Sequence, residues 1–418
     1  MDTDLLLNLA WVVLMSVLGM ALPVGIGLRA ARVTRGQGPP GAGRLLLAGL
    51  LALLIALACG FSLQYGAVHL PQLGEEARPA WQWAPFGEGS GILAWGGPGL
   101  SGAENGRMAL FLFQVAGTAT VVLLALAPLH ARLPGLGLAA AALAIGGLLY
   151  PLLGHWAWGG GWLAAAGQMA CLGHGFADWG GAGVHYALGG LLALGGLLAT
   201  RTRREEGEGE SRPALVPVLL AVFGMTALHS ASAWAALPRM GLVVANTWVG
   251  SAAAGLVAAV YMAFTTTRVG TPMLARGLLA GAAASAGLAA FAPPTTLLLV
   301  GAVAGLIACL GSYLVEQVWR LDDPSGVVPA FGFGGLWGVL ATGLFADGTY
   351  GQGLNGVGAG RYLGVPGQGV SGIALLAPGM VPDYAQLAVQ VLGAVVILGW
   401  ALGVGWLLFR LVSIRPRK

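Results

Sequence analysis

Long apolar runs recur along the whole chain, and short segments with charged residues, prolines or glycines separate them. A helix that crosses a lipid bilayer needs about 20 mostly apolar residues. The runs reach this length repeatedly, which excludes a protein held by a single anchor. The pattern predicts an all-α polytopic membrane protein with about eleven transmembrane helices, at residues 5–28, 45–66, 108–130, 134–153, 181–200, 214–235, 241–265, 274–292, 296–318, 328–346 and 385–411.

The charges in the loops test this number of spans, because short cytoplasmic loops are enriched in Lys and Arg. The loops after odd-numbered spans are basic, whereas those after even-numbered spans are acidic or carry only Arg239. We therefore expect a multi-pass protein of the cell membrane with its N-terminus outside and its C-terminus in the cytoplasm, which requires an odd number of spans. The basic residues are Arg29, Arg32, Arg35, Arg44, Arg132, Arg201, Arg203, Arg204, Arg268, Arg320, Arg415, Arg417 and Lys418.

A hydrophilic stretch at 201–213 divides the chain into two halves. We expect a first half at 1–200 with spans one to five and a cytoplasmic linker at 201–213. A second half follows at 214–384 with spans six to ten and an extracytoplasmic loop, and residues 385–418 form span eleven and a short tail. Spans five and ten carry glycines at matching offsets, and halves of five spans face the membrane in opposite senses, which predicts an inverted repeat of five plus five. A shared glycine-rich composition is the alternative explanation.

Composition supports the membrane assignment and argues against other classes of protein. Of the 418 residues, 57% are hydrophobic and 9% are charged, whereas soluble domains carry roughly 25% charged residues. The net charge of +4 is spread over the loops, so no nucleic-acid partner is expected. Cys59, Cys171 and Cys309 show no CxxC spacing, which argues against a disulfide framework or a thiolate metal site. The segment Met1–Asp4 lacks the positive charge of a signal peptide, so the first run is expected to be retained.

His185 in span five is the most informative single residue. An ionisable side chain within a span is costly and commonly marks a pathway or a binding site; the alternative is a histidine bonded to a neighbouring backbone. Asp178 precedes span five, a position typical of a structural carboxylate that caps a helix. The aromatic residues Trp156 and Trp158 follow span four. They are suited either to hold a cation over their rings or to form an interfacial belt.

The other polar residues do not indicate catalysis. His155, His174, His185 and His229 lie on different segments without a neighbouring carboxylate, which argues against a metal site. The chain contains no nucleophile elbow, P-loop or dinucleotide fingerprint followed by an acid. We therefore expect a channel or transporter rather than an enzyme, with no metal and no cofactor.

Several stretches, in order along nearly the whole chain, resemble the ammonium transporter family (Amt/Mep/Rh). Phe113-Gln114 in span three is similar to the family's Phe-Gln pair. The stretch from Asp178 to His185 is similar to its Asp…Val-His…Gly motif, but it is one residue shorter between Asp and His. The further matches are Trp158-Gly-Gly-Gly, Asn246-Thr247 and Leu321-Asp322-Asp323-Pro324 with the following Gly332, Gly335 and ATGLFA.

The resemblance implies a homotrimer with one pore per subunit that conducts ammonium-derived species. An outer site would hold the cation against aromatic rings and a hydroxyl, which by position are those of Phe113, Trp158 and Ser232. Two stacked phenylalanines would gate the pore below this site. Two histidines, from spans five and ten, would line its centre.

The chain departs from the family pattern at these pore positions. Gly117 and Leu228 stand where the gate phenylalanines are expected. His185 keeps the histidine of span five, but Phe331 replaces its partner in span ten, so two imidazoles cannot share a proton there. His229, beside the gate position, is a candidate polar group nearer the mouth. The chain also ends soon after span eleven, so regulation by a PII-type protein is not expected.

Three functions remain open at this point. The first is transport of ammonium, ammonia or methylammonium through an altered pore. The second is a non-conducting ammonium sensor on the same scaffold, in which Phe331 blocks the path. The third is a channel for another small solute, because Gly117 and Leu228 would leave a wider gate.

Overall fold

The computed structural model describes residues 3–33, 40–66, 68, 71–74, 81–85, 87, 91–97, 99–100, 103–201, 215–237, 239–266 and 269–413. Of the expected linker at 201–213, only Arg201 falls within the described residues. Arg35, Arg203, Arg204, Arg268 and the three basic residues of the tail also lie outside them, as do Glu75, Glu76 and Glu88.

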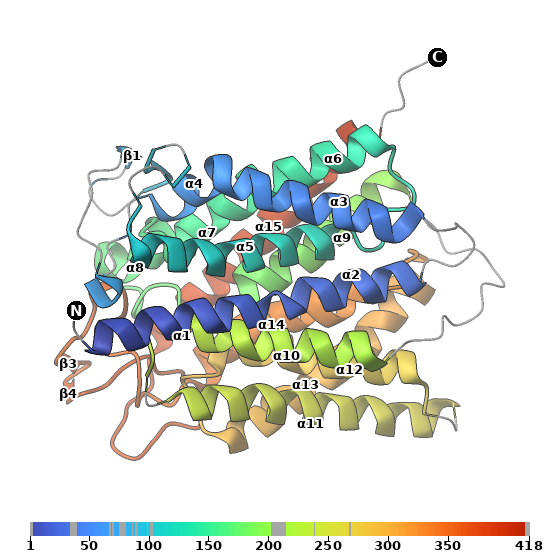
Figure 1. The fold of residues 1–418 in the computed structure, drawn as a ribbon. Coiled ribbons are helices and arrows are strands. Elements are labelled where there is room, and N and C mark those ends of the chain that lie inside the picture. Colours follow the sequence, from blue (N-terminus) through green and yellow to red (C-terminus); the bar gives the residue numbers. More distant parts are fainter. Residues whose placement is uncertain are drawn as a thin grey trace.

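The first half of the chain is a series of helices (Figure 1). Several of them adjoin a single π-helical turn. Its elements are α1 (Thr3–Gly19), α2 (Ala21–Val33), α3 (Pro40–Ile55), η1 (Ala56–Gly60), α4 (Phe61–Tyr65), α5 (Asn105–Leu126), α6 (Gly135–Ala144), η3 (Ile145–Leu149), α7 (Tyr150–Trp158), α8 (Trp162–Ala170), η4 (Ala182–Ala187) and α9 (Leu188–Thr200).

Residues 215–413 are also mainly helical, and short strands and 3-10 turns occur only between helices of the described chain. The helical elements are α10 (Leu215–Ala231), α11 (Met240–Thr266), α12 (Thr271–Leu288), α13 (Pro294–Tyr313), η5 (Leu314–Val318), η6 (Val328–Phe333), α14 (Gly334–Phe345) and α15 (Tyr384–Val412). The short elements are η2 (Pro71–Leu73), η7 (Leu354–Gly356) and the antiparallel pairs β1 (Trp81–Trp83) with β2 (Leu93–Trp95) and β3 (Arg361–Tyr362) with β4 (Val365–Pro366).

The protein is a multi-pass membrane protein, and nine of the eleven predicted spans coincide with candidate membrane-crossing helices of the described residues. Within the described residues, nine helices are long and apolar enough to cross a membrane. The shorter apolar helix α10 and the helix α12 coincide with the two remaining predicted spans, six and eight. Helix α8, with nine residues, was not predicted and is too short to cross.

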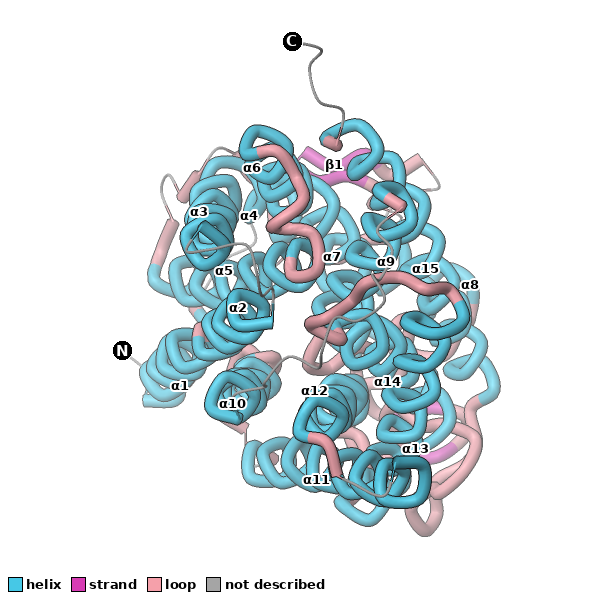
Figure 2. Tube along the Cα trace, turned by 90° about the vertical axis from the view of Figure 1, so that its right-hand side faces the viewer, coloured by secondary structure: helices cyan, strands magenta, loops and turns pink. Residues whose placement is uncertain are grey.

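The two halves face each other along one bundle. In Figure 2, which looks along the helices, α10 to α14 lie on one side and α3 to α9 on the other. Span five is the most enclosed part of the bundle, with 94% of its apolar window buried, against 22% for the first span and 28% for the last. The centre of the molecule is therefore built around η4 and α9.

Small residues let spans five and ten approach closely at this centre. A Cβ at Gly190 of α9 would lie 2.6 Å from the Cα of Gly332 in η6. A Cβ at Gly335 of α14 would lie 2.5 Å from the backbone nitrogen of Ala187. Such contacts permit the close backbone approach that stabilises helix pairs in lipid. The inverted repeat itself stays a prediction.

Candidate functional site

Three rings from separate elements form an aromatic cluster: Phe113 of α5, Trp158 of α7 and Trp234, which follows α10. The ring centroid of Phe113 is 6.1 Å from that of Trp158 and 6.5 Å from that of Trp234. The indole N–H of Trp158 donates to the backbone carbonyl of Asp178 at 2.9 Å, which fixes the orientation of this ring. Phe113 is buried, while both tryptophans are half-buried.

His185 lies directly against the aromatic cluster. Its ring centroid is 5.1 Å from Trp158, with the planes nearly perpendicular, and 6.0 Å from Phe113. Its Nε2 is 3.1 Å from the hydroxyl of Tyr150 in α7, whereas its Nδ1 lies beside the backbone of Gly180 without a hydrogen bond of ordinary geometry. The structure thus brings together Phe113, Trp158 and His185, which the sequence had selected separately.

Gly117 leaves the room that this arrangement needs. A Cβ at position 117 would lie 2.5 Å from Nε2 of His185 and 2.5 Å from the hydroxyl oxygen of Tyr150. The resemblance implied a gate phenylalanine at this position. The imidazole of His185 instead fills the space next to Gly117.

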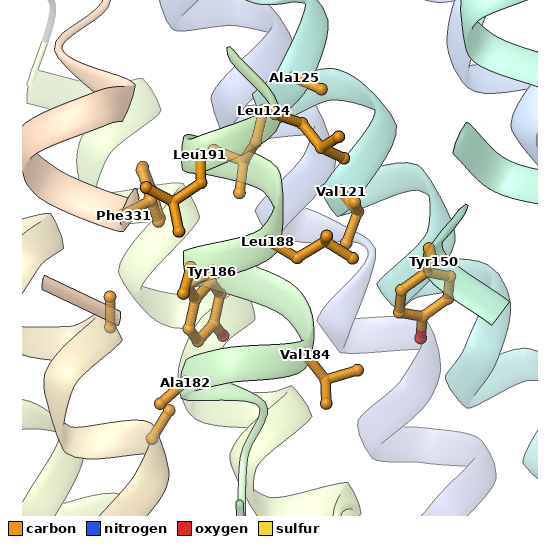
Figure 3. Packing of buried hydrophobic residues seen from close by; sticks show 14 of the residues in the cluster. Val121, Leu124, Ala125, Tyr150, Ala182, Val184, Tyr186, Leu188, Leu191 and Phe331 are labelled. Carbon is orange, nitrogen blue, oxygen red and sulfur yellow. The ribbon is translucent and has the colours of Figure 1, made fainter. Parts of the chain in front are cut away.

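The next residue, Tyr186, points to the other side of span five. Its hydroxyl is 2.9 Å from Nε2 of His229 in α10, and Nδ1 of His229 is 2.9 Å from Oγ1 of Thr247 in α11. The ring of Phe331 lies beside Tyr186, with their centroids 5.9 Å apart. Figure 3 shows Tyr186 and Phe331 together on one side of the helix and Tyr150 on the opposite side.

The structure does not bring all the expected pore residues together. A Cβ at Gly19 of α1 would lie 2.6 Å from a methyl group of Leu228, so the Leu228 side chain packs against α1. Its neighbour His229 is the residue of α10 that reaches Tyr186. The hydroxyl of Ser232 donates to the carbonyl of Leu228 at 2.8 Å, and the residue beyond α10 that packs on Phe113 is Trp234.

Sequence reasoning missed the two tyrosines and the role of Thr247 in this centre. One signal was present for Tyr186. The segment from Asp178 to His185 is one residue shorter than the family motif, so the residue at the motif's own distance from the aspartate is Tyr186. Thr247 was matched only as part of the Asn246-Thr247 pair, without a partner, and Tyr150 gave no signal, because their partners lie 18 and 35 residues away in the chain.

Asp178 caps the π-helical turn that carries both His185 and Tyr186. Its Oδ2 accepts hydrogen bonds from the backbone N–H groups of Gly183 at 3.0 Å and Val184 at 2.9 Å. Burial raises the pKa of this carboxyl to about 6, against the opposing effect of the backbone amides. The geometry is that of the structural carboxylate expected at this position.

Two glutamines of α15 hold the segment that leads to Asp178. The Gln386 side chain accepts from the backbone N–H of His174 at 2.8 Å and donates to the carbonyl of Gly175 at 3.0 Å. Gln390 makes the same pair of bonds with the backbone of Ala177, at 2.9 and 2.7 Å. Span eleven therefore fixes the position from which Asp178 caps η4.

Asp323 plays the matching role in the second half. Its carboxylate accepts from the backbone N–H of Val328 at 2.8 Å, at the start of η6, and from the hydroxyl of Ser325 at 2.9 Å. The guanidinium of Arg29 donates to the carbonyl of Ser325 at 3.0 Å and so ties this loop to span one. Each half thus places a buried aspartate in front of a π-helical turn.

The site offers two kinds of contact to a small nitrogen compound. Faces of aromatic rings attract a cation electrostatically, and hydroxyl oxygens accept N–H hydrogen bonds. The hydrogen bonds that the structure gives the side chains of His185 and His229 lead to hydroxyl groups rather than to carboxylates. Such a site favours weak, reversible contacts over tight capture of an ion.

The chain matches the model of the Ammonium Transporter Family over residues 10–417. Among curated proteins, it is 33% identical over 291 residues to ammonium transporter Amt2 of Archaeoglobus fulgidus. That match covers 65% of this chain and 58% of Amt2, so the matched region spans less than two thirds of that relative. An ammonium transporter of Bacillus subtilis is 28% identical over 206 residues, which is 48% of each protein.

Two solved structures have a fold similar to that of this chain. A sensor Amt protein superposes with a TM-score of 0.77 at 21% identity, covering 97% of this chain and 93% of the other. Mep2 of Candida albicans gives a TM-score of 0.78 at 20% identity, covering 99% of this chain and 86% of its own. At these identities the likeness concerns the fold.

Proposed function

The chain belongs to the Ammonium Transporter Family, and on that premise we propose that it transports ammonium or ammonia, and methylammonium as a close analogue, through a path inside each subunit. The observation that carries the proposal is the buried imidazole of His185, which lies 5.1 Å from the ring of Trp158. A buried histidine next to aromatic faces is suited to receive a small cation or its neutral base.

The proposed route runs from the aromatic cluster past His185 to the packed rings of Tyr186 and Phe331. Neighbouring rings along this route lie close together. The ring centroid of Tyr186 is 6.1 Å from that of His185 and 5.9 Å from that of Phe331. At the entrance, Ser232 adds a hydroxyl. In this proposal Gly117 keeps the space for His185, and Leu228 supports the route by packing against α1.

We further propose that the protein is a homotrimer in the cell membrane, with its N-terminus outside and its C-terminus in the cytoplasm. The trimer rests on the family, and the orientation rests on the basic loops after odd-numbered spans. Native mass spectrometry in detergent tests the trimer. Labelling of single cysteines at the two termini from outside the cell tests the orientation.

Uptake into cells that lack their own ammonium transporters tests the proposed route. The wild-type protein should restore saturable uptake of labelled methylammonium and growth on low ammonium, and His185→Ala should abolish both. His130→Ala is the matched control, because His130 is also buried but bonds to the carbonyl of Ala127 away from the aromatic cluster. Equal loss in both variants, or full uptake by His185→Ala at equal expression, contradicts the route.

The alternative function is a non-conducting ammonium sensor. The specific observation in its favour is Phe331, which is 1% exposed and packs against Tyr186 in the middle of the route. Saturable ammonium binding to the purified protein without any flux in vesicles would establish this alternative and overturn transport. Flux of a different small solute in the absence of ammonium flux would favour the third function, a channel for another solute.

A further inference from the structure

We propose that Tyr186 and His229, completed by Thr247, form a dyad that takes a proton from a nitrogen solute at the centre of the route. This inference rests on the proposed function, and it names the groups that handle the proton. The dyad joins three elements, η4, α10 and α11, and each of its side chains is fully buried.

The hydrogen bonds assign the protons within the dyad. The hydroxyl of Thr247 donates to the carbonyl of Val243 at 2.9 Å, one helical turn earlier. Because a hydroxyl carries one proton, Oγ1 of Thr247 accepts from Nδ1–H of His229 at 2.9 Å. Nε2 of a neutral His229 is then unprotonated and accepts from the hydroxyl of Tyr186 at 2.9 Å.

This assignment leaves the oxygen of Tyr186 as the group that a solute meets. The hydroxyl proton points at His229, so its lone pairs are free to accept an N–H bond. The ring of Phe331, at a centroid distance of 5.9 Å, closes this side of the centre without offering a competing donor. The imidazole itself is held behind the tyrosine.

The proton transfer balances without any further reactant. An ammonium ion gives a proton to the Tyr186 oxygen while the hydroxyl proton of Tyr186 passes to Nε2 of His229. The products are neutral ammonia, an unchanged tyrosine and an imidazolium that donates through Nδ1 to Thr247 and through Nε2 to Tyr186. The reverse transfer returns the proton to a nitrogen base that leaves the centre.

The surroundings of His229 hold the ring in place. The indole N–H of Trp179 donates to the backbone carbonyl of His229 at 2.9 Å. A Cβ at Gly180 would lie 2.7 Å from Cδ2 of His229, so only glycine leaves room for the ring. Asp178, at the head of the same segment, interacts electrostatically with Tyr186.

The other tyrosine–histidine pair of the centre lacks one feature of this dyad. Tyr150 is 3.1 Å from Nε2 of His185, but Nδ1 of His185 has only the backbone of Gly180 beside it, without a hydrogen bond of ordinary geometry. An imidazolium there would leave one N–H poorly paired in a buried site, which is costly. His229 is therefore the better-prepared proton acceptor of the two.

Nuclear magnetic resonance of the full-length protein in lipid vesicles, with ¹⁵N in the histidine rings, tests the dyad independently of transport. The chain has six histidines, and His229→Asn assigns the resonances of residue 229. Ammonium chloride should convert Nε2 of His229 from the unprotonated to the protonated form, whereas potassium chloride should not. Tyr186→Phe keeps the ring and should abolish this conversion.

Transport by the same preparations gives the second readout. Tyr186→Phe should lower ammonium flux about 100-fold, the lower end of what a general acid–base group contributes. Thr247→Val should also lower the ammonium flux, whereas Thr247→Ser, which keeps the hydroxyl, should retain the wild-type flux. Thr120→Val is the matched control with unchanged flux, because buried Thr120 bonds to the carbonyl of Ala116 in its own helix.

The outcomes separate the two proposals. Flux by the wild-type protein with an unchanged His229 resonance and full activity of Tyr186→Phe would overturn the dyad and leave transport standing. Protonation of His229 by ammonium without flux would support the dyad and overturn transport. Neither flux nor protonation would overturn both.

Discussion

At the residue scale, the sequence singled out His185 as an ionisable residue within a span, but it did not indicate that Phe113 and Trp158 lie against it. Hydrophobic pattern reports which residues lie within a span, not which faces of distant helices meet. The centre instead depends on a small residue at 117 and on tyrosines whose hydroxyls bond to histidines from other helices. Such pairs become visible only once the helices are packed.

Gly117→Ala tests the space around His185. The added methyl group would lie 2.5 Å from both Nε2 of His185 and the Tyr150 hydroxyl, so their bond should break, at a cost of about 1–3 kcal/mol in stability. Ammonium flux should fall and thermal unfolding in detergent should occur earlier. Gly241→Ala is the control, since a Cβ there meets nothing within 4 Å; an equal effect of both variants would contradict this explanation.

Phe331→His tests whether the bulk of Phe331 limits conduction. The smaller, polar ring beside Tyr186 should raise ammonium flux relative to the wild type, measured in vesicles at equal protein content. Phe331→Leu removes the ring without adding a polar group and separates size from polarity. An unchanged or lower flux in Phe331→His would show that the route is built around the phenylalanine.

At the element scale, the two π-helical turns at the centre are each preceded by a buried aspartate. Asp178 and Asp323 each precede an apolar run in the sequence. For Asp178, this place before an apolar run predicted a capping role. The sequence did not predict the π-helical geometry of η4, because one additional residue in a turn leaves the apolar pattern almost unchanged. That geometry directs His185 to one side of the helix and Tyr186 to the other.

Replacement of Asp178 should loosen this turn. Asp178→Ala removes the acceptor of two buried backbone N–H groups, with an expected loss of about 2 kcal/mol in stability. Asp178→Asn keeps one oxygen acceptor and should lose less than half of that. Thermal unfolding of the purified variants measures both, and equal melting temperatures for Ala and Asn would count against the cap.

The stability of the turn should also depend on pH. Burial raises the pKa of Asp178 from its ordinary value of 3.8 to about 6 in the folded protein. The folded state therefore binds this proton more tightly than the unfolded state, so the stabilisation is present at low pH and is lost as pH rises toward and through 6. The wild type should lose stability relative to Asp178→Asn between pH 4 and 7; a constant difference in melting temperature would refute this.

At the scale of the whole molecule, the number and order of the spans could be predicted because each crossing needs its own apolar run. The degree to which each span is buried could not be predicted from the sequence. A helix that faces lipid and a helix that faces other helices are equally apolar, yet 94% of the apolar window is buried in span five and 22% in the first span. The close approach of spans five and ten at the centre follows from this packing and from the glycine contacts between them.

The central claim is that the protein carries ammonium through the route past His185, and a concentration jump on purified proteoliposomes tests it most directly. A step of ammonium chloride across vesicles with the wild-type protein should give a saturable ammonium flux, followed by an ammonium-sensitive probe inside the vesicles. Empty vesicles, a step of potassium chloride and His185→Ala should give none. Ammonium flux no greater than that of empty vesicles, with correctly inserted protein, would contradict the account.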